Sequence, residues 1–121
     1  MLRVNAGRGP STIHGNGLIA GEFIPKGTTV WQFQPGFDVL IPEAKLELLS
    51  PAAREHTVYW SYFHQATKTY VMSSDDDRFT NHSDEANTQA VGNHTVAVRD
   101  IQAGEEITNN YDELGTLDYH G

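Results

Sequence analysis

Short runs of β-branched and aromatic residues recur along the chain, and glycines and prolines separate one run from the next. Such runs favour β-strands, and the residues between them are typical of turns. Strands are predicted at residues 18–20, 28–34, 57–64, 69–72, 95–98 and 106–108. The polar stretch 65–68 is short enough to join two of these strands as a hairpin. The pattern therefore predicts a mostly β protein.

One region departs from this pattern and indicates helix. Residues 42–49 begin with Pro42 and are rich in strong helix formers, and residues 50–55 repeat the signal with Ser50 in the position of an N-cap. We therefore expect a small helical insertion at about residues 42–56, between β-rich flanks.

Two segments share the spacing Ile-x-x-Gly-x-x-aliphatic, one at residues 24–30 and the other at residues 101–107. Each predicts a tight turn before a strand, with Gly27 or Gly104 at a position that needs a positive φ. Two interpretations stay open from the sequence: two unrelated glycine turns, or two related units of a folded-over sheet.

The composition narrows the class of protein. The length of 121 residues suits one domain, residues 1–121, with a single modest core. The absence of cysteine excludes a disulfide scaffold, a thiolate nucleophile, an iron–sulfur cluster and a cysteine-ligated zinc. No apolar run has the length of a transmembrane helix, and the first residues show no signal-peptide pattern. These features predict a soluble intracellular protein, cytoplasmic if its host is prokaryotic, without a membrane partner.

The net charge of −8 is concentrated in one part of the chain. Residues 73–121 hold 2 basic and 11 acidic side chains, whereas residues 1–72 hold 6 basic and 5 acidic ones. Because duplex binding depends on Lys and Arg that neutralise phosphates, nucleic acid is not an expected partner. The asymmetry is either a solvated acidic face or a surface that attracts a cationic ligand.

Metal and hydrolase chemistry find little support in the sequence. The six histidines, which are His14, His56, His64, His82, His94 and His120, include no i, i+4 pair and no His-Glu-x-x-His motif, so no metal site is predicted. A nucleophile motif Gly-x-Ser-x-Gly is absent as well. The acidic run 75–77 lacks the spacing of a calcium loop and is predicted to be a solvated turn.

Three polar or glycine-containing segments remain as candidates for chemistry. Residues 11–20 contain His-Gly-Asn-Gly, in which glycines let the backbone approach a ligand closely. Residues 78–87 read Arg-Phe-Thr-Asn-His-Ser-Asp-Glu-Ala-Asn and offer many directional hydrogen-bonding groups. Residues 104–111 read Gly-Glu-Glu-Ile-Thr-Asn-Asn-Tyr and place a tyrosine at the end of a predicted strand.

These three segments, in this order, resemble the motifs of the SET-domain protein lysine methyltransferases. The first resembles the family's His-Gly-x-Gly stretch, followed by its Ile-x-x-Gly turn at residues 24–27. The second resembles Arg-Phe-x-Asn-His-Ser-x-x-Pro-Asn, with Ala86 where proline is usual, and the third resembles Gly-Glu-Glu-Ile-Thr-x-x-Tyr. The resemblance covers residues 11–112.

The resemblance implies a fold and a reaction. The fold would be a β-clip of short twisted sheets whose C-terminal motifs thread into a pseudoknot. The protein would transfer a methyl group from S-adenosylmethionine to a lysine of a basic protein or peptide, a histone or another, and release S-adenosylhomocysteine without a metal. The catalytic residue would be Tyr111. The cofactor-binding residues would be His14, Gly15, Asn16, Gly17, Arg78, Phe79, Asn81 and His82, with Arg78 and Phe79 supporting the pocket rather than doing chemistry.

The physical demands of methyl transfer agree with such a site. An in-line displacement depends on alignment in a dry, shaped cavity. The lysine must also lose a proton, and its ordinary pKa of about 10.4 leaves it charged at pH 7 unless the site desolvates it. Candidate walls of the lysine channel are Trp60, Tyr62, Tyr70, Asn109 and Tyr119, although each aromatic ring among them suits a core position equally well.

Two departures from the family pattern leave questions open. Asn109 stands where many relatives carry a Phe or Tyr that limits how many methyl groups fit, so the number transferred is not predicted. The cysteine-rich zinc segment that closes the lysine channel in many relatives is absent. Either the tail 112–121 folds over the channel, anchored by Leu117 and Tyr119, or a second subunit in a homodimer covers it. A non-catalytic interaction module on the same fold is the alternative to the enzyme, and a metal-dependent hydrolase has only the histidine count behind it.

Overall fold

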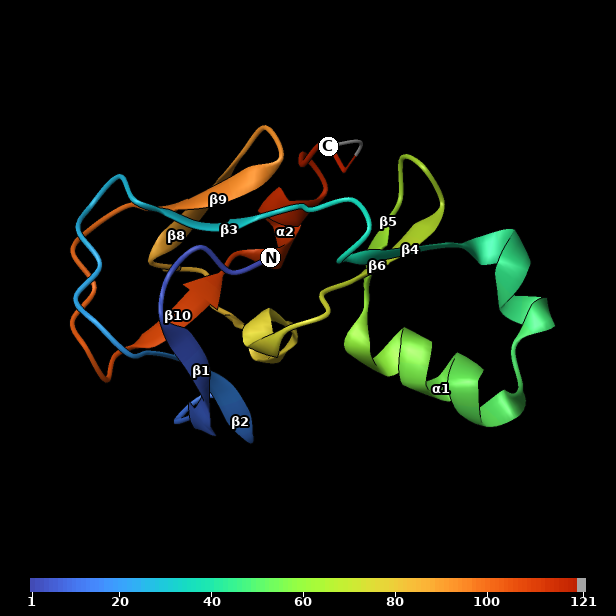
Figure 1. Ribbon diagram of the computed structural model, residues 1–121, viewed down its shortest axis with the longest axis horizontal. Helices are drawn as coiled ribbons and strands as arrows, with labels where there is room; N and C mark the ends of the chain where they lie inside the picture. Colours follow the sequence, from blue (N-terminus) through green and yellow to red (C-terminus); the bar gives the residue numbers. More distant parts are fainter. Residues whose placement is uncertain (120–121) are drawn as a thin grey trace.

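Three small sheets form the frame of the protein in the computed structural model, which describes residues 1–119 (Figure 1). The first sheet has the order β1-β2-β10-β7, with strands Ala6–Pro10, Asn16–Ala20, Glu106–Asn109 and Asn81–His82. The second has the order β3-β9-β8, with strands Thr29–Gln32, His94–Ala97 and Thr88–Val91. The third has the order β4-β6-β5, with strands Val39–Pro42, Thr69–Met72 and Tyr62–His64. The prediction of a mostly β fold of short sheets is confirmed, while the pseudoknot stays a prediction.

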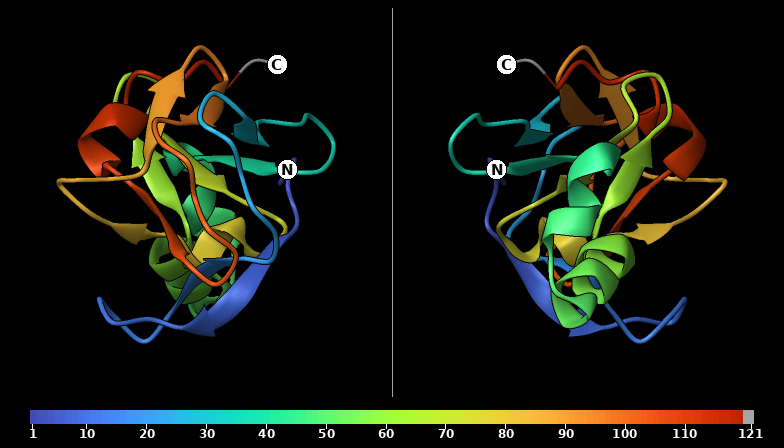
Figure 2. Two further views of the ribbon diagram at one scale, coloured as in Figure 1. Left: turned by 90° about the vertical axis from the view of Figure 1, so that its left-hand side faces the viewer. Right: turned by 90° about the vertical axis from the view of Figure 1, so that its right-hand side faces the viewer.

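Helical elements are short and lie outside the sheets. The 3₁₀ helix η1 spans Glu43–Leu48 and the helix α1 spans Pro51–Trp60. Both lie at one end of the long axis of the molecule, and the right-hand view of Figure 2 looks onto that end. A second 3₁₀ helix, η2, spans Asp76–Phe79, and the helix α2 spans Tyr111–Leu114. The predicted helical insertion is therefore present, but it extends beyond residue 56.

The predicted strand at residues 57–64 is wrong in its first part, because α1 continues through Trp60 and β5 starts only at Tyr62. Ser50 caps the helix by accepting a hydrogen bond from the Ala53 N–H, as predicted. The buried Thr57 donates its hydroxyl to the Ala53 carbonyl one turn earlier, so a β-branched residue is accommodated within the helix. The β propensity of residues 57–60 is thus overridden by capping and by packing.

The two Ile-x-x-Gly segments pair with each other. Ile24 and Ile101 form an antiparallel bridge in which each backbone N–H donates to the other residue's carbonyl at 2.8 Å. Gly27 and Gly104 have φ values of +89° and +86°, so the predicted positive φ is confirmed at both. The two segments are therefore neighbours that pair through this bridge and have the same turn conformation.

Strands β1, β4, β7 and β8 were not predicted from the sequence pattern. The sequence of β1, Ala-Gly-Arg-Gly-Pro, has low β propensity, but all five residues pair with β2. A Cβ at Gly9 would lie 2.8 Å from Cγ1 of Ile19, so the absence of a side chain there lets the two strands approach. Long-range pairing, which propensity does not contain, decides this strand.

The buried apolar side chains form two clusters. The first consists of Leu18, Ala20, Ile24, Val30, Ala97, Ile101 and Ile107 and lies between the first two sheets and the Ile-x-x-Gly turns. The second consists of Trp31, Phe33, Val71, Leu117 and Tyr119. Leu117 and Tyr119 are 4% and 7% exposed, so the two predicted anchors of the tail are buried. The remaining residues of that tail, 120 and 121, lie outside the described residues, as does His120 of the histidine set.

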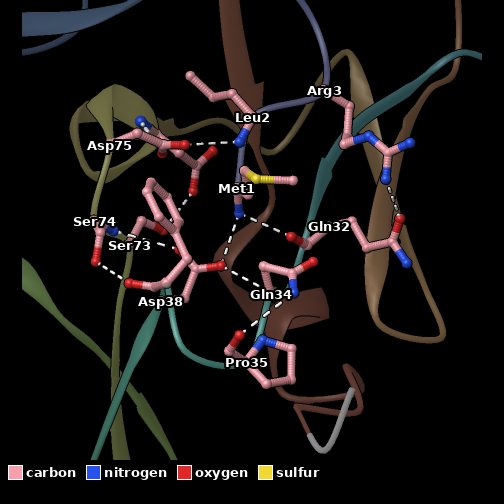
Figure 3. Close-up of polar contacts among 12 residues, drawn as sticks. Met1, Leu2, Arg3, Gln32, Gln34, Pro35, Asp38, Ser73, Ser74 and Asp75 are labelled. Atoms are coloured by element: carbon pink, nitrogen blue, oxygen red, sulfur yellow. Dashed lines mark hydrogen bonds and ion pairs between the residues drawn. The ribbon is translucent and has the colours of Figure 1, made fainter.

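Two aspartates hold the first residues of the chain against the sheets (Figure 3). The α-ammonium of Met1 lies 2.7 Å from Oδ2 of Asp38, whose side chain is fully buried, and also donates to the Gln32 carbonyl. The backbone N–H of Leu2 donates to Oδ2 of Asp75 at 2.7 Å. The segment 73–77 is therefore tied to the N-terminal residues. Within residues 1–119, no helix is long and apolar enough to cross a membrane.

Candidate active site

Strand β10 brings the three candidate segments together. It lies in the first sheet between β2, which it meets in antiparallel register, and β7, which it meets in parallel register. Thr108 is opposite Asn81, and Asn109 is opposite His82. The buried side chain of Ile107 fixes this strand in the first core cluster. The polar residues of segments 78–87 and 104–111 consequently lie side by side.

The side-chain amide of Asn81 ties segment 11–20 to β10. Its Nδ2 lies 3.0 Å from Oε2 of Glu106, 3.1 Å from both Ser11 Oγ and the His14 carbonyl, and 3.3 Å from the Asn16 carbonyl. The Ser11 hydroxyl in turn donates to Oε1 of Glu106 at 2.7 Å. An amide nitrogen surrounded by four acceptors is a strong constraint on the loop 11–16, since every contact depends on a donor at this one position.

Gly17 is required by the close approach of the same network. A Cβ at this position would lie 2.8 Å from Cδ of Glu106 and 3.1 Å from Cβ of Ser11, and it would contact Oε2 of Glu106 as well. Any side chain would therefore displace the carboxylate that accepts hydrogen bonds from Ser11 and Asn81. The absence of a side chain at Gly17 therefore leaves room for the Glu106 carboxylate beside this loop.

His82 positions the tyrosine at the end of β10. Its Nδ1 accepts a hydrogen bond from the backbone N–H of Tyr111 at 3.0 Å, and its Nε2 lies 2.8 Å from Oδ1 of Asp84. Because Nδ1 accepts a hydrogen, the neutral ring carries its proton on Nε2, where it donates to Asp84. The rings of His82 and Tyr111 also pack edge to face, with centroids 5.2 Å apart.

Tyr111 begins the short helix α2, which Asn110 caps. Its hydroxyl donates to the backbone carbonyl of Thr80 at 2.5 Å. Burial raises the pKa of this phenol above its ordinary value, and the negative charge of Asp77 raises it further. The hydroxyl is therefore neutral near pH 7 and acts as a hydrogen-bonding group rather than as an ion.

Two cavities meet at Tyr111. The first, which we call the aromatic cavity, has a volume of about 240 Å³ and is lined largely by rings, among them Trp31, Trp60, Tyr62, Phe63 and Tyr119. The second, the polar cavity, has a volume of about 430 Å³ and is lined by His14, Gly15, Asn16, Arg78, Phe79 and Asn81, among others. Both linings include Tyr59, Trp60, Arg78, Thr80 and Tyr111. The Tyr111–Thr80 contact thus borders both.

Most of the predicted site residues divide between the two cavities, while Trp60 and Arg78 line both. Six of the eight predicted cofactor residues line the polar cavity, whereas Gly17 and His82 are not in its lining and support it through Glu106 and Tyr111. Four of the five predicted channel residues, Trp60, Tyr62, Asn109 and Tyr119, line the aromatic cavity. Tyr70 lies in neither lining and instead packs against Phe63, with ring centroids 4.7 Å apart.

Several residues of the site were not assigned a role from the sequence. The run 75–77 is not the solvated turn that was predicted, because Asp75 accepts backbone hydrogen bonds and Asp77 lines the aromatic cavity. Asn87, 2% exposed, donates to the Glu106 carbonyl and accepts from the Thr108 N–H. The only sequence signal for these roles was their place within or next to segment 78–87. In the described part of the chain, no group of three or more His, Asp or Glu residues is arranged to hold a metal ion.

Comparison with known proteins agrees with this arrangement. The family model of the SET domain matches residues 15–112. Comparison with curated protein sequences gives no significant match. Among solved structures, a humanized mutant of the Chaetomium thermophilum Polycomb Repressive Complex 2 bound to an inhibitor matches 91% of this chain with a TM-score of 0.65 at 23% identity. The match covers 15% of the Polycomb chain.

Two further structures show the same fold. The crystal structure of the Chaetomium thermophilum Polycomb Repressive Complex 2 matches 89% of this chain and 15% of its own, with a TM-score of 0.66 at 21% identity. A Plasmodium falciparum protein described as a histone methyltransferase matches 91% of this chain and 95% of its own, with a TM-score of 0.58 at 20% identity. At these identities the likeness shows the fold alone.

Proposed function

The chain belongs to the SET-domain family, and from this premise we propose that it is a protein-lysine N-methyltransferase that uses S-adenosylmethionine and acts on a basic protein or peptide. One observation carries the proposal beyond family membership. A polar cavity and an aromatic cavity share the Tyr111–Thr80 contact in their linings. A reaction between a bound methyl donor and a bound lysine needs two such cavities that meet at one point.

The polar cavity fits the methyl donor chemically. The four contacts of the Asn81 amide are made by its nitrogen, so its carbonyl oxygen is available to the ammonium of an amino acid. The Arg78 guanidinium lies 5.3 Å from the ring centroids of both Trp60 and Phe79, which leaves its edge able to bind a carboxylate. S-adenosylmethionine would supply a methyl group on a positively charged sulfur.

We assign the predicted cofactor residues on this basis. The backbone of His14, Gly15 and Asn16 and the side chains of Arg78, Phe79 and Asn81 would contact the donor. Gly17 would keep the loop in place, and His82 would hold the backbone of Tyr111.

The aromatic cavity fits the side chain of a lysine. Its rings exclude water from a four-carbon chain and remove solvent from the ammonium, which lowers the pKa of the amine. Tyr111 stands between the cavities as the predicted catalytic residue, and its neutral hydroxyl, with the Thr80 carbonyl, can orient the reacting groups. Burial raises the pKa of the Tyr62 phenol, and the negative charge of Asp112 raises it further. An acidic side chain beside this cavity, together with the acidic second part of the chain, favours a cationic substrate.

The tail is our candidate for the wall that closes the aromatic cavity. Leu114, Leu117 and Tyr119 line it, and the Tyr119 hydroxyl donates to the Leu114 carbonyl at 3.0 Å. This favours closure by the tail over closure by a second subunit. Removal of residues 114–121 should therefore abolish methyl transfer, and unchanged transfer by the shortened chain would contradict closure by the tail.

The experiment is methyl transfer from labelled S-adenosylmethionine to a panel of basic proteins, histones included. We expect transfer by the wild type and its loss, by about 10²-fold or more, in Tyr111→Phe, since the hydroxyl orients the reacting groups. Tyr70→Phe, which removes a tyrosine hydroxyl outside both cavities, is the matched control. Equal rates in wild type and Tyr111→Phe contradict the catalytic assignment. Calorimetry that shows no binding of S-adenosylmethionine would instead favour the non-catalytic interaction module.

A further inference from the structure

The aromatic cavity contains one acidic side chain that the proposed reaction has not yet used. Asp77, from η2, lines it among the rings of Trp31, Trp60 and Tyr62. Asp77 is half-buried as a residue and belongs to the lining of this cavity. Burying a carboxylate among aromatic rings costs free energy unless a hydrogen-bond donor or a cation pairs with it.

Hydrogen bonds within the protein use only part of the accepting capacity of the Asp77 carboxylate. The Ser73 hydroxyl donates to Oδ2 of Asp77 at 2.8 Å. The Thr80 hydroxyl lies 2.6 Å from the backbone carbonyl of Asp77 and 3.2 Å from its Oδ1. A hydroxyl has a single hydrogen, and the shorter contact takes it. Oδ1 is thus left with a weak hydrogen bond and can accept another.

No cation of the described chain pairs with Asp77. Within residues 1–119 it forms no ion pair with Lys, Arg or His. The Met1 ammonium is bound to Asp38 (Figure 3), and Arg78, the next residue, stacks on Trp60 and Phe79.

The surroundings of Asp77 leave its carboxyl easily protonated, with a pKa raised to about 6. Burial is the main cause and the charge of Asp75 adds to the rise, while the hydroxyls of Ser73 and Thr80 and the Met1 ammonium oppose it. The phenols of Tyr111 and Tyr119 line the same cavity, and burial, with a further contribution from the charge of Asp77, raises the pKa of both. Both phenols are neutral near pH 7, so neither compensates the carboxylate.

We propose that Asp77 binds the ammonium group of the target lysine in the aromatic cavity and accepts its proton, an inference that rests on the proposed function. An ammonium has three donors, one of which Oδ1 of Asp77 accepts, while the surrounding rings attract the cation. In the proton transfer, the Nζ–H bond breaks and its electron pair stays on Nζ. The proton bonds to Oδ1 of Asp77, which leaves a neutral amine beside a neutral carboxylic acid.

The assignment has a defined dependence on pH. Asp77 pairs with a cation only as a carboxylate, so binding is strongest well above pH 6 and weakens as the pH falls through about 6. Between pH 8 and pH 5 the ionised fraction of such a group falls about tenfold. A bound ammonium must in turn lower the pKa of Asp77.

The test uses n-butylammonium, which reproduces the lysine side chain, and the full chain without a methyl donor. Calorimetry at pH 8 should show binding by the wild type that weakens about tenfold at pH 5. Asp77→Asn should bind at least tenfold more weakly at pH 8 and show no dependence on pH. Asp76→Asn, the same change one residue away, is the control. Asp77→Asn that binds like the wild type, or wild-type binding that is equal at both pH values, overturns the proposal.

Two further measurements keep the proposal testable if Asp77→Asn fails to fold. Carboxyl-carbon NMR of the wild type should show a pKa near 6 for Asp77 that falls when n-butylammonium is added, and an unchanged pKa overturns the proposal. Methyl transfer reports the proposed function separately. A wild type that binds n-butylammonium through Asp77 but transfers nothing contradicts the proposed function and supports the ammonium site, whereas undiminished transfer by Asp77→Asn overturns the proton-accepting role.

Discussion

Replacement of Asn81 by aspartate tests the network that shapes the polar cavity. The substitution exchanges an amide nitrogen for an oxygen of almost the same size, at a position surrounded by Glu106 Oε2, Ser11 Oγ and two backbone carbonyls. The two hydrogens of the amide make at best one bond to the Glu106 carboxylate and one to a neutral acceptor. Their loss is worth about 2–4 kcal/mol.

Repulsion adds to this loss. Two carboxylate oxygens about 3 Å apart repel by roughly 5 kcal/mol at an effective dielectric constant of 20. Part of that energy is relieved when the new carboxyl takes up a proton, so its pKa in the folded protein rises above the ordinary value. A raised pKa stabilises the fold at low pH and loses that contribution as the pH rises through it. Asn81→Asp should therefore lose about 4 kcal/mol or more at pH 8 and distinctly less at pH 5, where the protonated acid can donate to Glu106.

The assay is urea unfolding of wild type and variant at both pH values, with S-adenosylmethionine binding measured in parallel. Asn110→Asp is the matched control, because the Asn110 side chain accepts a hydrogen bond from the Asp112 N–H and an aspartate caps a helix equally well. It should change the free energy of unfolding by less than about 0.5 kcal/mol. If the two variants lose the same stability at both pH values, the donor role of Asn81 is refuted.

Three further predictions follow from the same contacts. Gly17→Ala should weaken S-adenosylmethionine binding at least tenfold by calorimetry, because its Cβ displaces the Glu106 carboxylate; unchanged affinity would show that the loop relaxes freely. Asn87→Ala should lower the free energy of unfolding in urea by about 2–4 kcal/mol, since it leaves the Glu106 carbonyl and the Thr108 N–H unpaired; a loss below 1 kcal/mol would contradict this accounting. Asp77→Asn should stabilise the fold at pH 7 by at most about 3 kcal/mol, the equivalent of a pKa raised from 3.8 to about 6 in the folded state, and the gain should vanish towards pH 4. Thermal unfolding at both pH values checks the sign, and a gain that grows at low pH would refute it.

Local signals in the sequence were sufficient where the structure is decided locally. The Ser50 cap, the hairpin loop 65–68 and the positive φ at Gly27 and Gly104 each depend on a few neighbouring residues. The three motif segments were also found in the right order, and the structure brings most of their predicted site residues to two adjoining cavities.

Features decided by distant partners could not be predicted in the same way. The residues of β1 have low β propensity, and the strand forms because it pairs with β2. Residues 57–60 have strand composition but complete a helix that Ser50 starts. The run that contains Asp77 was predicted to be solvated, and only the folded structure places this residue in the lining of a cavity. The role of Glu106 depends in the same way on contacts with the distant residues Ser11 and Asn81.

The central place of β10 also determines when the site can exist during synthesis. This strand follows all the other described strands in the chain, yet it fills the gap between β2 and β7. Until it has left the ribosome, both neighbours expose unpaired strand edges, which favour association with other chains. Before β10 has been made, Asn81 also lacks its hydrogen bond to Glu106, which helps to hold the loop 11–16. The first sheet and the polar cavity can therefore be completed only after β10 has been made.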